Sequence, residues 1–118
     1  MKFILTNNPL VKTKLGNSIK IEFCDVSLHQ ILLLTRDYIH KGYKLLSHPL
    51  SGSIKPNETL YKSIMLDANI EKLDMQSLSI IENSIMLAKN FADRDIKIMQ
   101  QHKDDMMTVD LSIISGRL

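Results

Sequence analysis

The sequence predicts an α/β fold: a three-layer, Rossmann-like open sheet of about four to five mainly parallel strands with helices on both faces. Short apolar runs alternate with segments of helical periodicity along the chain. Helical connections between strands imply parallel strands with right-handed crossovers, which we expect for at least the first three strands. At 118 residues, the chain is expected to form a single domain over residues 1–118.

The first three elements follow from turn and cap signals. Residues 2–6 (KFILT) are an apolar run that stops at Asn-Asn-Pro, which predicts a buried strand. A two-turn helix follows, with Asn8 as its N-cap, Pro9 as its first helical residue and Gly16 as its left-handed stop. Residues 18–24 alternate apolar and charged side chains, which predicts a strand at a sheet edge.

Residues 27–42 carry the clearest helical pattern in the chain. Ser27 and Gln30 have the spacing of a capping box, and apolar residues then recur at steps of three and four. Gly42 is expected to close the helix. A third short strand is predicted at residues 43–47.

The second half of the chain predicts a strand and one long helix. Residues 61–67 read as a fourth strand, and Asp74 begins a helix expected to run to about residue 101. The core stripe of that helix would be Leu78, Ile81, Ile85, Ala88, Ala92, Ile96 and Met99. The segment "MTVDLSII" near the C-terminus leaves two alternatives, an edge strand or a strand running into a short helix.

Composition excludes several classes of protein. The longest aliphatic run, Ile31 to Leu34, is far too short to cross a membrane, and the N-terminus does not resemble a signal peptide. Cys24 is the single cysteine, so an internal disulfide is excluded and a cytoplasmic location is predicted. Aromatic residues are only 5%, which argues against nucleic-acid binding. The four histidines show no ligand spacing, so no metal site is predicted.

Charge is unevenly distributed along the chain. Residues 1–66 hold nine Lys and Arg against four Asp and Glu, whereas residues 67–118 hold six against nine. Polar residues also follow the first three predicted strands, as Thr6-Asn7-Asn8, Cys24-Asp25 and Ser47-His48. In open α/β sheets, ligands bind beyond the carboxyl ends of the strands. A site for a small acidic ligand is therefore expected at this edge.

The loop of residues 47–62 leaves from the same edge and carries the residues of a predicted anion site. Gly52 allows successive backbone amides to turn inward as a nest, and two lysines supply positive charge. Suitable ligands are phosphate, an acyl phosphate or a small carboxylate. The alternative is an ordinary turn-rich loop, because no nucleotide-cofactor motif is present. The predicted ligand-binding residues are Asn7, Asn8, Ser51, Gly52, Ser53, Lys55, Asn57 and Lys62.

Catalysis is a further alternative for the same loop. His48 would act as a general base, with Glu58 orienting it or Lys55 stabilising an oxyanion. Cys24 would be a nucleophile if an imidazole lowered its pKa. Structural explanations compete with both assignments, since a lone cysteine after an apolar strand is usually a small buried hydrophobe.

Two stretches of this chain, "TNNPLV" and "HKGYKLLSHPLSGSIKPNETLYKS", resemble the GrdX family. These small proteins are encoded beside the glycine, sarcosine and betaine reductase systems of anaerobic bacteria that ferment amino acids. The family often has threonine where this chain has Ser47, and proline where it has Leu60. The resemblance implies an accessory protein with a reductase subunit as a partner. It carries over no catalytic residue and no cofactor.

A binding role in assembly is the last alternative. Seven methionines are many for this length, and thioether side chains suit adaptable contact surfaces. Met106 and Met107, together with the broad apolar face of the long helix, predict a homodimer or docking on a reductase subunit. The sequence therefore predicts a non-catalytic accessory protein that binds a small anion or a partner through loop 47–62. The alternative is a small enzyme that acts on a carboxylate or acyl phosphate through His48.

Overall fold

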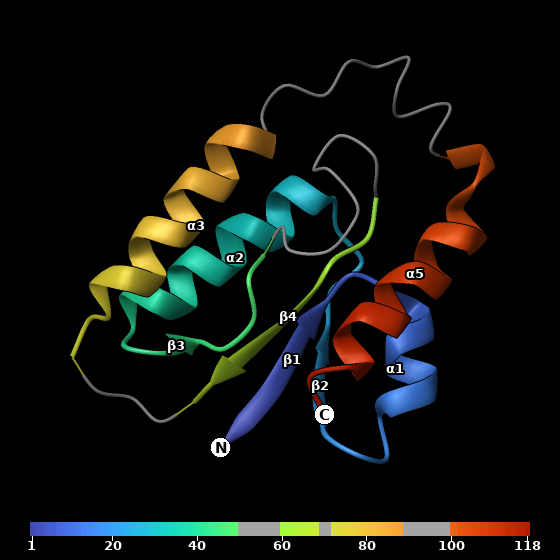
Figure 1. Cartoon of the computed structure of the whole chain (residues 1–118), viewed down its shortest axis with the longest axis horizontal. Helices are drawn as coiled ribbons and strands as arrows, with labels where there is room; N and C mark the ends of the chain where they lie inside the picture. The colour runs from blue at the N-terminus through green and yellow to red at the C-terminus, as the bar shows by residue number, and fades with distance from the viewer. Residues whose placement is uncertain (50–59, 69–71, 89–99) are drawn as a thin grey trace.

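The computed structural model describes residues 1–49, 60–68, 72–88 and 100–118. Within these ranges the chain is an α/β protein with a four-stranded mixed sheet and four helices (Figure 1). No helix in these ranges is both long enough and apolar enough to cross a membrane. The elements are β1 Lys2–Thr6, α1 Pro9–Leu15, β2 Lys20–Phe23, α2 Leu28–His40, β3 Lys44–Leu45, β4 Ser63–Asp67, α3 Met75–Ala88 and α5 Lys103–Ser115.

The strand order is β2-β1-β4-β3, and it corrects the predicted mainly parallel sheet. β1 pairs with β2 in parallel, whereas β4 lies between β1 and β3 and pairs antiparallel with both. The first three strands therefore do point the same way, but the strand between two of them is reversed. This mixed sheet is not the doubly wound sheet of a Rossmann-like fold. The reason is burial, because β1 and β4 are the most apolar strands and take the two central positions, whereas charged β2 takes the predicted edge.

Side chains alternate along β1 and enter two separate apolar clusters. Phe3 and Leu5 pack with the buried residues of α2 and α3. Ile4 packs with Val11 of α1 and with Ile114 of α5 on the other face. Figure 1 shows α2 and α3 together on one side of the sheet and α1 with α5 on the other. The period of two in KFILT thus decides which helix pair each side chain meets.

The predicted helix starts are confirmed, and one predicted stop is wrong. Asn8 caps α1 by accepting a hydrogen bond from the Leu10 amide at 3.0 Å. Ser27 and Gln30 form the reciprocal capping box of α2. Gly42 has a φ of 101°, whereas Gly16 is right-handed with a φ of −60°. There is no room for a side chain at Gly16, because an added Cβ would lie 2.5 Å from the Lys12 carbonyl oxygen.

The C-terminal third differs from the prediction at residues 103–115. The described part of the predicted long helix is α3, Met75–Ala88, and residues 89–99 lie outside the described ranges. Asp74 begins α3 as predicted, accepting hydrogen bonds from the amide and the hydroxyl of Ser77. Residues 103–115 form the helix α5, so both strand alternatives for "MTVDLSII" are wrong. Its β-branched residues favour a strand locally, but Leu111 and Ile114 at helical spacing meet α1 and the sheet.

A buried polar network fastens α5 to the end of the sheet. The Asp110 carboxylate is only 3% exposed and accepts hydrogen bonds from the Ser63 amide at 2.9 Å and the Ser63 hydroxyl at 2.7 Å. It also accepts one from Asn8 Nδ2 at 3.0 Å. Since an ionised carboxylate only accepts, the Ser63 proton points to Asp110. The Thr6 hydroxyl, 2.7 Å from Ser63 Oγ, must then donate to it.

Replacing the carboxylate should loosen this attachment strongly. Asp110→Ala leaves three buried donors without an acceptor, so we expect a loss of about 3 kcal/mol or more in the free energy of unfolding. Urea denaturation measures the loss. Asp105→Ala is the matched control, because Asp105 is exposed in the first turn of the same helix and should cost less than about 1 kcal/mol. Equal losses in the two variants would contradict the role of the network.

Candidate functional site

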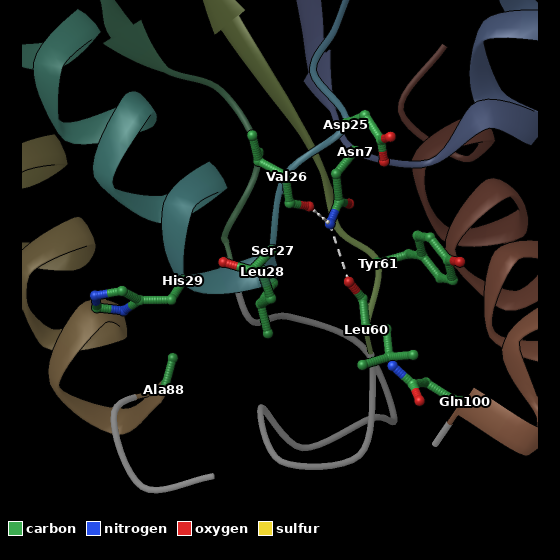
Figure 2. A pocket seen from close by; sticks show the side chains of 10 residues that line it. All are labelled: Asn7, Asp25, Val26, Ser27, Leu28, His29, Leu60, Tyr61, Ala88 and Gln100. Carbon is green, nitrogen blue, oxygen red and sulfur yellow. Dashed lines mark hydrogen bonds between the residues drawn. The ribbon is translucent and has the colours of Figure 1, made fainter. Parts of the chain in front are cut away.

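A cavity of about 500 Å³ lies beyond the carboxyl ends of β1 and β2 (Figure 2). The sequence predicted a site at this edge of the sheet. Its wall comes from five parts of the chain: the residue after β1, the stretch from the end of β2 into the first turn of α2, the segment before β4, the end of α3 and the approach to α5. The lining residues are Asn7, Asp25, Val26, Ser27, Leu28, His29, Leu60, Tyr61, Ala88 and Gln100.

Asn7 holds three of these segments together. Its Nδ2 donates to the carbonyl oxygens of Val26 and Leu60, each at 3.0 Å, as Figure 2 shows. Its Oδ1 accepts from the Lys62 amide at 2.9 Å. The side chain is 4% exposed, so these bonds form away from competing water. Asn7 therefore holds the segment after β2 against the segment before β4, and both segments line the cavity.

The described wall is acidic at one side. Asp25 and Tyr61 lie on the same side of the cavity in Figure 2. The pKa of Tyr61 is raised, first by burial and then by the carboxylates of Asp104 and Asp25. Tyr61 thus keeps its proton at neutral pH and has an uncharged hydroxyl. No lysine or arginine is among the described lining residues.

The opposite side of the cavity contains the first turn of α2. His29 extends from this turn toward Ala88 at the end of α3 (Figure 2). Its Nδ1 is buried and has no hydrogen-bond partner within the described ranges. Ser27 Oγ accepts from the Gln30 amide, so the Ser27 hydroxyl has a structural role as the cap of α2. A buried unpaired nitrogen costs free energy, which favours a polar ligand group or water beside His29.

The structure gives different roles to the predicted ligand-binding residues at the sheet end. Asn7 lines the cavity, whereas Asn8 is fully buried and faces α5. Lys62 is 6% exposed and does not line the cavity; its pKa is lowered by burial, an effect that Asp110 opposes. The rest of the predicted anion site lies outside the described residues and stays a prediction: Ser51, Gly52, Ser53, Lys55 and Asn57.

The predicted catalytic residues are not part of the cavity wall. His48 is exposed and is not among the lining residues, and Glu58 lies outside the described ranges. Cys24 is half-buried against the core of α2 and α3, and its amide bonds to the Thr6 carbonyl at 2.9 Å. Among the described residues, no group of three or more metal-binding side chains comes together.

Sequence reasoning missed His29 and Tyr61 as site residues. The signal for Asp25 was present, since it directly follows the strand at residues 18–24. Tyr61 carried a weaker signal as the residue that opens the predicted fourth strand. His29 lay inside a helix prediction, and only the position of that helix start at the sheet end brings it to the cavity.

The raised pKa of Tyr61 predicts a stability difference that depends on pH. Above about pH 10 the unfolded chain ionises this tyrosine while the folded chain still holds its proton. The free energy of unfolding of the wild type should then fall more steeply with rising pH than that of Tyr61→Phe, and the two curves should run parallel below that pH. Urea unfolding from pH 7 to pH 11 tests this. Curves that stay parallel throughout would contradict the buried, acid-flanked position of the hydroxyl.

Comparison with known proteins places the chain in a family. The model of one family, described as GrdX-like protein, matches residues 3–118. No curated protein and no solved structure matches the chain. The match covers the β1 end, the first turn of α2 and the described residues before β4, which together form most of the cavity wall. The chain therefore belongs to the GrdX-like protein family.

Proposed function

We propose that this GrdX-like protein is a cytoplasmic, non-catalytic accessory protein of a glycine-reductase-type fermentation system that binds a small metabolite. The observation that carries the binding role is the cavity at the carboxyl ends of β1 and β2. Its volume of about 500 Å³ lies within the range of small-molecule sites, roughly 300–1,000 Å³. The reductase context is supported by the family alone.

The cavity wall has the composition of a binding site for a small polar molecule. Four lining side chains are apolar: Val26, Leu28, Leu60 and Ala88. Polar groups stand at separate points around them, with Asp25 and Tyr61 on one side and His29 on the other. Such a wall excludes water from the ligand and orients it through a few polar contacts.

The chemistry of the described wall favours binding over catalysis. A nucleophilic side chain needs a base within hydrogen-bond reach. The Ser27 hydroxyl is the one aliphatic hydroxyl in the wall, and it serves as the cap of α2. His29 lies on the other side of the cavity from Asp25 (Figure 2). The described lining residues therefore offer contacts, and they do not form a nucleophile–base pair.

Loop 47–62 contributes to the same proposal through its described end. Leu60 and Tyr61 are its last residues before Lys62, and both line the cavity. A small anion such as phosphate, an acyl phosphate or a carboxylate remains one candidate ligand, with Lys55 as the residue that would hold it. Ser47 has a structural role instead, because its hydroxyl accepts from the Met65 amide at 2.9 Å.

Thermal unfolding against phosphate, acetyl phosphate, glycine and betaine tests the binding role. A ligand present at a hundred times its dissociation constant adds about 2.7 kcal/mol, which raises the midpoint of a domain of this size by several degrees. Leu60→Trp should abolish the shift by filling the cavity, and Leu73→Trp is the matched control at an exposed leucine outside the wall. A shift that survives Leu60→Trp would place the ligand elsewhere.

Homodimer formation is a second proposed property, supported by exposed apolar side chains. On α3, Met75 and Met86 are each 66% exposed and Leu87 is 55% exposed. Met106 and Met107, which the sequence favoured for this role, are both half-buried on α5. Large apolar side chains gathered on one exposed helix are typical of contact surfaces. The described surface thus favours α3 over α5 as the face that meets a second copy.

Met86→Asp should convert a dimer into a monomer, because it places a charge in an apolar contact. Size-exclusion chromatography with light scattering measures the molar mass of each variant. Asn17→Asp is the matched control, since it adds the same charge at an exposed asparagine that follows α1, away from the α3 face. A monomeric wild-type protein would refute the dimer, and an unchanged dimer in Met86→Asp would move the contact away from this face.

A further inference from the structure

We propose that the cavity recognises the positively charged amine group of its ligand, through the Asp25 carboxylate and the Tyr61 side chain. This inference rests on the proposed binding function and names the ligand class. The relevant ligands are small molecules with a protonated or quaternary ammonium group. A ligand recognised only through an anionic group would not fit this side of the cavity.

The first argument is the sign of the charges at the cavity. Asp25 is the only charged side chain among the described lining residues apart from the titratable His29. A second carboxylate, Asp104, acts on Tyr61 from the start of α5. Lys62, the nearest lysine along the chain, is buried near Asp110 instead of lining the cavity. The two carboxylates that the described residues place at this side therefore favour a cation.

The second argument is the type of surface beside these carboxylates. Tyr61 lines the cavity and carries an aromatic ring, which extends toward α5 in Figure 2, and a cation is attracted to the face of such a ring. Val26 and Leu60 add apolar surface, and both are held in place by Asn7. A carboxylate beside an aromatic ring and apolar carbons is the usual environment of a bound ammonium group with its methyl or methylene substituents.

The third argument is that the recognition groups are positioned in advance. Asn7 Nδ2 donates to the carbonyl oxygens of Val26 and Leu60. Val26 follows Asp25 and Leu60 precedes Tyr61, so Asn7 joins the two segments that carry the recognition groups. Both hydrogen bonds are 3.0 Å long and partly buried. The backbone segments that carry the carboxylate and the ring are therefore held together without a ligand, which lowers the entropic cost of binding.

Isothermal titration calorimetry with matched ligands tests the proposal at low ionic strength, where exposed carboxylates are least screened. Choline and 3,3-dimethylbutan-1-ol have the same shape, but only choline carries the positive charge. We expect choline to bind at least tenfold more tightly than the neutral alcohol. Betaine has the same trimethylammonium group with a carboxylate in place of the hydroxymethyl group, so comparing it with choline shows whether the ligand is a simple cation or a zwitterion.

Two variants separate Asp25 from general charge effects. Asp25→Asn should weaken choline at least tenfold and leave the alcohol unchanged, and it should fold normally because Asp25 is exposed. Asp37→Asn is the matched control, since it removes one exposed carboxylate from the part of α2 that does not line the cavity. Tyr61→Phe should retain most of the affinity because it keeps the ring, whereas Tyr61→Leu should lose it.

The outcomes distinguish this inference from the function on which it rests. Equal affinity for choline and the neutral alcohol, or choline binding that Asp25→Asn leaves intact, would overturn the cation proposal. Binding of phosphate or acetate that Leu60→Trp abolishes, without any binding of choline or betaine, would overturn it and keep the cavity as a binding site. An absence of binding by every ligand tested would overturn both.

Discussion

The carboxylate of Asp110 on α5 is buried where this helix meets the sheet and the start of α1. It accepts from Ser63 at the start of β4 and from Asn8 at the start of α1. One side chain of α5 therefore joins β4 to α1, and the Thr6 hydroxyl of β1 enters the network through Ser63. Three hydrogen bonds offset the free-energy cost of burying the carboxylate, and the three donors would lose this acceptor if α5 moved away.

This network also fixes the inner wall of the cavity, because Asn7 and Asn8 are consecutive and point to different partners. Asn8 bonds to Asp110 and to the Met107 carbonyl of α5. Asn7 bonds to the segments after β2 and before β4, which both line the cavity. The two asparagines at the end of β1 therefore have different roles: Asn8 attaches α5, and Asn7 holds the wall of the cavity.

The charged residues at the cavity are those that the fold brings there, and they do not reflect the charge distribution along the sequence. The basic half of the chain supplies most of the lining residues, yet it places the carboxylate of Asp25 at the cavity. The second carboxylate, Asp104, comes from the acidic half. The lysines that suggested an anion site either lie outside the described residues or, like Lys62, are buried. A net charge summed over a segment carries no information on which side chains meet at its cavity.

From the sequence alone, the local elements could be predicted: β1, the Asn8 cap and the capping box of α2. The sheet edge at which the sequence predicts a site is also the edge at which the cavity lies. These depend on contacts between residues close in the chain and on general rules of sheet architecture. The tertiary structure alone decided that β4 lies reversed between β1 and β3, that residues 103–115 are helical and that His29 and Tyr61 share a cavity. Each of these depends on partners far apart in the chain, such as Asp110 with Asn8, whose pairing leaves no local signal.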